Sequence, residues 1–163
     1  MRKSRLITIV LAVVAMAGLA LAAGPAYYVQ AQVVRGNKGA TGPSCVLVST
    51  FKTGEQVVWL AEVYSTQTGK VVTPDEAKKL GMKVTAKLEN GTTVDLEYGQ
   101  HPKQGEPKVW MWAAGWQIPP VYPTGVLKFE LVVTDSQGNT ATWQPLQADY
   151  PGGYASMITV AKR

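Results

Sequence analysis

Residues 118–144 read IPPVYPTGVLKFELVVTDSQGNTATWQ, and this stretch decides the fold class. In the run 126–134 every second residue is apolar, and these residues share one face of the strand: Leu127, Phe129, Leu131 and Val133. A period of two is typical of a half-buried β-strand. Residues 135–139 then supply a turn, because Gly and Asn accept positive φ angles, and 140–144 begins the return strand. The prolines of 119–125 lack amide donors and confine that segment to a sheet edge. The stretch therefore predicts the last hairpin of a β-sandwich.

The rest of the chain predicts more strands and one short helix. Strands are expected at 27–35, 45–51, 56–65, 83–88, 93–98, 108–116 and 155–161. Asn90-Gly91 marks a hairpin turn, and Trp59 is expected to pin two packed sheets. Thr73-Pro74-Asp75-Glu76 has the N-cap, first-turn proline and capping-box glutamate of a helix that ends at Gly81. Together these signals predict an all-β fold, a single immunoglobulin-like β-sandwich of about 7–8 strands with one short helix.

The N-terminus has the pattern of an export segment. Residues 1–5 are basic and 6–23 are apolar with a small-residue end, so 1–31 is predicted to be a signal peptide cut after Ala22 or Ala31. The alternative is an uncleaved membrane anchor through residues 6–23. Either outcome places the folded part outside the cytoplasm, periplasmic or extracellular. Residues 32–44 are expected to be a flexible, Gly-rich lead-in, and 45–163 the sandwich domain.

The charge pattern argues against a nucleic-acid partner. The chain carries 16 basic and 11 acidic residues, a net charge of +5. Three of the basic residues belong to the export segment, which leaves 13 against 11 on the remainder. Phosphate binding needs a concentrated positive face, and no basic cluster longer than Lys78-Lys79 is present.

Few residues are suited to catalysis. The chain has one His and one Cys, and it lacks the G-x-S-x-G and H-E-x-x-H motifs of common hydrolases. We therefore expect that the protein is not an enzyme and binds no cofactor. Cys45 is expected to be a buried strand residue. The alternative is that Cys45 and His101 bind copper or zinc, since both are ligand types that these metals prefer.

The chain has more tryptophans than a core of this size usually needs. Five are present, and three aromatic residues are candidate partner-binding residues: Trp112, Trp116 and Tyr122. Exposed aromatics beside prolines suit a protein-partner anchor or a sugar-stacking platform. The other interpretation makes Trp116 a lid that closes one end of the core.

The turn segment 134–140, TDSQGNT, and the segment 51–59, FKTGEQVVW, resemble the corresponding segments of bacterial immunoglobulin-like domains. More faintly, the second segment together with His101-Pro102 and Ile118-Pro119 is similar to small exported accessory proteins of periplasmic redox and cytochrome systems. The resemblance covers roughly residues 45–161. It implies a non-catalytic interaction or accessory module that binds a protein partner in an extracytoplasmic or membrane-associated assembly.

Overall fold

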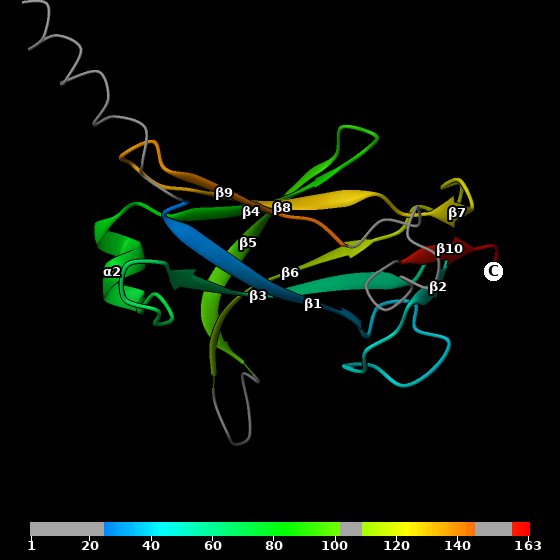
Figure 1. Ribbon diagram of the computed structural model, residues 1–163. Coiled ribbons are helices and arrows are strands. Elements are labelled where there is room, and N and C mark those ends of the chain that lie inside the picture. The colour runs from blue at the N-terminus through cyan, green and yellow to red at the C-terminus, as the bar shows by residue number, and fades with distance from the viewer. Residues whose placement is uncertain (1–24, 102–108, 146–157) are drawn as a thin grey trace, which may run out of the picture.

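The computed structural model describes residues 25–101, 109–145 and 158–163, and this part of the chain is all-β with one short helix. Its elements are β1 (Tyr27–Arg35), β2 (Thr50–Lys52), β3 (Gln56–Ser65), α2 (Pro74–Lys79), β4 (Lys83–Leu88), β5 (Thr93–His101), β6 (Val109–Gln117), β7 (Gly125–Val126), β8 (Phe129–Thr134), β9 (Thr140–Trp143) and β10 (Thr159–Ala161). Figure 1 shows α2 beside the start of β1, at the opposite end from β7, β10 and β2.

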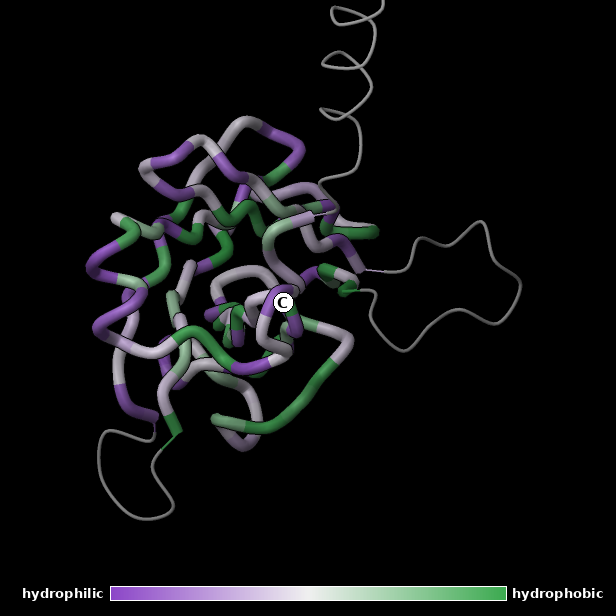
Figure 2. Tube along the Cα trace, turned by 60° about the vertical axis from the view of Figure 1, so that its left-hand side comes forward, coloured by the Kyte–Doolittle hydropathy of each residue, from purple (hydrophilic) through white to green (hydrophobic). Residues whose placement is uncertain are grey.

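Seven strands form one antiparallel sheet that curls into a nearly closed barrel. The strand order is β1-β3-β6-β5-β4-β8-β9, and the outer strands β1 and β9 lie next to each other. A second sheet, β2-β10-β7, sits at one end (Figure 1), and its β10–β2 pair is parallel. Figure 2, with the C-terminus toward the viewer, shows the chain running round this barrel.

The predicted division into two separate packed sheets is only partly present, and β5 is the reason. Its first part pairs with β4, where Val84 lies opposite Leu96, and its second part pairs with β6, where Glu97 lies opposite Ala113. One strand thus belongs to both halves of the barrel. The two faces of the expected sandwich are joined through it.

The barrel interior is filled by the alternate residues that the sequence pattern predicts. Leu127, Phe129, Leu131 and Val133 are all buried. On the facing side β3 buries Val57, Trp59, Ala61 and Val63. The Trp59 ring packs against the Phe129 ring with centroids 5.6 Å apart, so the predicted role of Trp59 as a central core residue is confirmed.

Two predicted strands are interrupted. The run 126–134 is divided into β7 and β8, because Leu127 donates its amide to Ile158 outside the main sheet. The prediction of a strand at 45–51 is wrong for most of its length, since only Thr50 and Phe51 of that range belong to β2. Residues 155–157 of the predicted last strand lie outside the described residues.

The helix and the Asn90-Gly91 turn form as predicted. The Thr73 hydroxyl accepts from the Glu76 amide, and the Glu76 carboxylate accepts from the Thr73 amide, which completes a capping box at the start of α2. Gly91 has a φ of 84°, the left-handed conformation that its turn needs.

The described residues begin inside the predicted export segment. Tyr27–Arg35 pairs with β3 along all nine of its residues, so residues 27–31 are an integral part of the sheet, and 32–35 complete the strand. The apolar run 6–23 lies outside the described residues. Among the described residues, no helix has the length and apolar character that crossing a membrane requires.

Asp135, in the turn 134–140 between β8 and β9, holds the seam between β1 and β9. Asp135 caps its own turn, accepting hydrogen bonds from the amides of Gln137 and Asn139. Its Oδ2 also accepts the Tyr27 hydroxyl of β1 at 2.6 Å. The Tyr27 hydroxyl, followed by the Asn139 amide side chain, lowers the Asp135 pKa to about 2. Burial, then the bond to Asp135, raises the Tyr27 pKa to about 12.

Candidate functional site

An open groove lies on the outer surface of β3, β6 and β5, and we call it the outer groove. Its volume is about 1030 Å³. Its floor includes outward positions of these strands with small or no side chains, namely Val58, Gly99, Ala113 and Gly115. The longer Gln56 side chain lies against Gly115. One wall comes from β5, through Asp95, Glu97 and His101, and the other from the loop after β1, through Gly36, Asn37, Ser44 and Cys45.

The loop wall is fixed by Glu55, which is fully buried. Its Oε1 accepts from the Thr41 amide at 2.8 Å and the Thr41 hydroxyl at 2.6 Å, while Oε2 accepts from the Lys52 amide at 2.8 Å. Arg35, at the end of β1, places its Nε 3.4 Å from Oε1 as an ion pair. A single carboxylate thus joins the end of β1, the loop and the β2–β3 turn.

These contacts determine the ionisation of Glu55. Burial alone would raise its pKa, but the Thr41 hydroxyl, the Lys52 and Thr41 amides and the Arg35 charge together hold the pKa below its ordinary value. The Glu55 carboxyl group is therefore ionised at neutral pH. Its negative charge is part of what holds the wall in place.

Close backbone contact adds to this anchoring. Gly39 has a φ of 64°, and a Cβ at this position would lie 2.1 Å from the carbonyl oxygen of Gly54. Only glycine fits there without moving the backbone. The Gly-rich composition of the loop thus allows it to approach the β2–β3 turn closely.

Cys45 and His101 both line the outer groove. The expectation that Cys45 is a buried strand residue is wrong, because it is exposed and has a φ of 58° in a turn. The Cys45 amide donates to the Arg35 carbonyl at 2.7 Å, which turns the chain back toward β1. Among the described residues, no group of three or more His, Cys, Asp or Glu side chains is placed to hold a metal ion.

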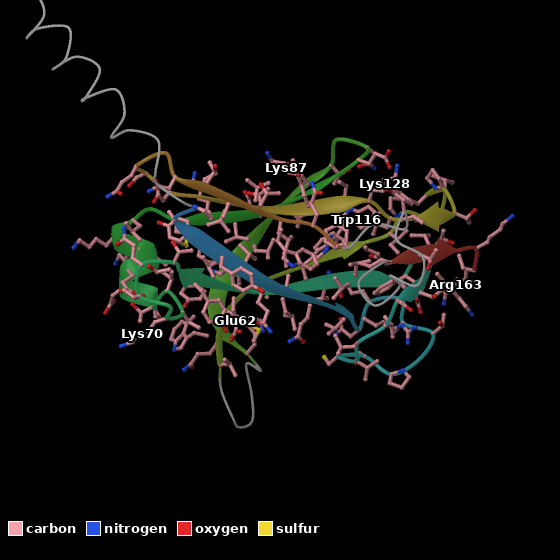
Figure 3. The ribbon with its side chains drawn as sticks, viewed as in Figure 1. Glu62, Lys70, Lys87, Trp116, Lys128 and Arg163 are labelled. Carbon is pink, nitrogen blue, oxygen red and sulfur yellow. The ribbon has the colours of Figure 1, made fainter. Side chains whose placement is uncertain are left out.

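The three candidate aromatic residues do not form one exposed platform. Trp112 is buried, which leaves little of its surface for a partner. Trp116 is half-buried and stacks on Trp59 at 6.4 Å, and Tyr122 packs its edge against Trp116 at 5.3 Å. Figure 3 shows Trp116 among the side chains between the strands. These positions match the interpretation of Trp116 as a lid on the core.

Other aromatic side chains are more exposed than the predicted ones. Trp110 is 41% exposed and packs against Tyr98, whose ring also stacks on Trp112 at 4.8 Å. Tyr28 is 61% exposed and packs against Tyr64 across β1 and β3. The alternation of 108–116 puts Trp110 on the same side of the strand as Trp112. Trp110 is nevertheless exposed, because it lies where β5 and β6 pair only with each other, beyond the ends of their pairing with β4 and β3. The strand pattern in the sequence does not show this extension.

Of the groove residues, the sequence pointed to Cys45 and His101 as a candidate site and did not identify the others. Glu55 looked like an ordinary turn residue, and Asp95 and Glu97 looked like single scattered acids. A signal was present: alternation in 93–101 puts Asp95, Glu97, Gly99 and His101 on one face. The small residues Ala113 and Gly115 face the same way on β6, but only the register of β5 with β6 brings the two sets together.

Comparison with known proteins adds little to this geometry. No family model matches the sequence, and no curated protein matches it. Among solved structures, the chain is similar to a DUF4426 family protein from Pseudomonas aeruginosa PAO1, with 16% identity and a TM-score of 0.38. That match covers 74% of this chain and 87% of the other. At this level the likeness supports no conclusion about function.

Proposed function

We propose that this chain is an exported, non-catalytic binding module of the immunoglobulin-like type. Its outer groove would receive a protein partner in an extracytoplasmic or membrane-associated assembly, of which a redox or cytochrome system is one example. The observation that carries the proposal is the groove itself, an open depression of about 1030 Å³ with a floor of small residues. The buried Glu55 carboxylate, which holds the loop wall against the end of β1 and the β2–β3 turn, gives this groove a fixed shape.

The position of the groove suits such a role. In Figure 1, β1 starts beside α2, while the loop after β1 lies toward the other end of the molecule. An anchor preceding residue 25 would therefore enter the fold at the α2 end. The loop wall of the groove would stay accessible to a partner.

The single cysteine allows a direct test, because Cys45 lies in the groove wall and is exposed. A photocrosslinker attached to its thiol should give one discrete adduct in membranes of the source organism. Ala113→Trp should abolish the adduct by filling the floor, whereas Thr142→Trp on the outer side of β9 should leave it. A Cys45→Ser, Gln137→Cys chain carries the same probe on the distant turn and should give none. An adduct that survives Ala113→Trp would contradict the proposal.

Metal binding is the second candidate, supported by the presence of Cys45 and His101 in the same groove. If the two residues bind copper or zinc, the purified protein carries a stoichiometric ion, and Cys45→Ser or His101→Ala lowers the metal content. A metal-free protein that also fails to bind either ion on addition would exclude this candidate. The module proposal stands in that case.

A further inference from the structure

The charged side chains of the outer groove point to one chemistry for its occupant. Asp95 and Glu97 take alternate outward positions of β5, and both are exposed. Among the described residues lining the groove there is no lysine or arginine. Asp95 accepts a hydrogen bond from the Thr85 hydroxyl at 2.8 Å, and neither carboxylate has an ion pair within the described part of the chain. Within the described lining, this wall of the groove therefore carries two carboxylates that form no ion pair.

This local charge opposes that of the whole chain, which is +5. The two ion pairs among the described residues use other carboxylates: Glu89 pairs with Lys128 at 3.3 Å and Glu55 with Arg35 at 3.4 Å. On the neighbouring strand β4, the register places Lys87 opposite Thr93 and Thr85 opposite Asp95. Lys83 and Lys87 therefore flank the acidic row, outside the groove lining.

The shape of the groove suits an extended chain. Its floor follows antiparallel strands, and Val58, Ala113 and Gly115 leave it low and partly apolar. The volume, about 1030 Å³, is at the upper end for small-ligand pockets, which span roughly 300–1,000 Å³. Lysine and arginine can lay their apolar stems along such a floor while their charged ends reach carboxylates at its edge.

We propose that the outer groove binds a cationic, extended segment of the partner polypeptide, with Asp95 and Glu97 as the residues that select positive charge. This inference rests on the proposed function and names the partner chemistry for the same site. It predicts attraction that weakens with salt, since the two carboxylates are exposed.

The test is fluorescence anisotropy of labelled peptides with the full folded chain. A short peptide of alternating lysine and valine should bind, and its glutamate–valine counterpart should not. Asp95→Asn with Glu97→Gln should weaken binding about tenfold, as two surface charge pairs are worth together about 1.4 kcal/mol. Glu89→Gln with Glu130→Gln makes the same change in net charge away from the groove and should have little effect. Lys83→Gln should tighten binding about threefold by removing a flanking positive charge.

Equal binding of the two peptides, or the same affinity in the Asp95→Asn, Glu97→Gln chain with an unchanged circular dichroism spectrum, would overturn the inference. The Cys45 crosslinking experiment separates this result from failure of the proposed function. If an adduct forms that depends on the groove but the groove shows no preference for cationic peptides, the proposed binding function is retained and the charge selectivity is rejected. If no groove-dependent adduct forms, the proposed binding function itself is rejected.

Discussion

Two carboxylates, Asp135 and Glu55, do similar work in two different parts of the molecule. Asp135 accepts hydrogen bonds from its own turn and from Tyr27, and closes the seam between β1 and β9. Glu55 accepts from Thr41 and Lys52 and pairs with Arg35, and fastens the wall of the outer groove. Each anchors a segment far from it in sequence through a ring of donors.

The difference between them is burial. Asp135 is partly exposed at the end of a hairpin, so loss of one of its bonds lets water replace the donor. Glu55 is fully buried, so its removal would leave the largely buried Arg35 guanidinium without its charge partner. We infer that loss of a single side-chain bond lowers the free energy of unfolding less at the barrel seam than at Glu55 in the groove wall.

The largest effect is expected from shortening β1. A chain beginning at residue 25 should fold, whereas one beginning at residue 32 loses residues 27–31 of the nine-residue strand, including Tyr27 and its bond to Asp135. The circular dichroism spectra of the two chains, and the heat capacity change when each is unfolded, measure this difference. The same reasoning predicts that any signal cleavage follows Ala22 and not Ala31, which intact mass of the mature protein measures. A mature chain that starts at residue 32 and folds cooperatively would contradict this.

The second effect is that of Glu55→Ala. Removing one partner from a buried ion pair and its hydrogen bonds should lower the free energy of unfolding by about 3 kcal/mol. Glu89→Ala, which breaks the exposed pair with Lys128, is the matched control and should cost under about 1 kcal/mol. Urea unfolding gives both values. Similar losses in the two variants would show that Glu55 is not a special anchor.

Tyr27→Phe should have a smaller effect, because it removes one hydrogen bond to Asp135 and keeps the ring in place. The expected cost is about 1 kcal/mol, measured by urea unfolding of the full chain. The outer groove should be unaffected, so Cys45 crosslinking should be unchanged. A loss as large as that of Glu55→Ala would remove the contrast between seam and groove wall.

The pH dependence of the two sites should differ in a measurable way. The folded pKa of Glu55 lies below its ordinary value, so its charge stabilises the fold above about pH 4.3 and this contribution is lost as pH falls further. The gap in unfolding free energy between the parent and Glu55→Gln should therefore shrink in acid. For Asp135 and Tyr27, carbon NMR should find titrations near 2 and near 12. An ordinary tyrosine titration at Tyr27 would mean that the seam bond does not form.

The sequence predicted the all-β class and most strands better than the groove, and it predicted a sandwich where the main sheet is a nearly closed barrel. Strand 56–65, helix 73–81 and the alternation of 126–134 are local patterns, and each appears close to its predicted place. The turn at 135–139 was predicted for the same reason, since Asp, Gly and Asn act within five residues. The bond from Asp135 to Tyr27 was not predicted, because the two residues are 108 positions apart.

The groove depends almost entirely on such distant pairings. The segment 32–44 was expected to be flexible from its Gly content, and nothing local indicates that Thr41 binds Glu55 or that Gly39 lies against Gly54. Cys45 was assigned to a strand because its neighbours are apolar, and the bend at this residue comes from its pairing with Arg35. Trp112 was a candidate partner-binding residue because of the number of tryptophans, and only its position opposite Ala61 in the sheet shows that it belongs to the core.

Whether the outer groove binds a partner is tested by Cys45 crosslinking in three chains: the parent, Ala113→Trp and Tyr27→Phe. We predict one partner adduct in the parent, none when the groove floor is filled by Ala113→Trp, and an unchanged adduct in Tyr27→Phe. Loss of the adduct in Tyr27→Phe together with its survival in Ala113→Trp would contradict binding in the outer groove, since binding would then depend on the seam.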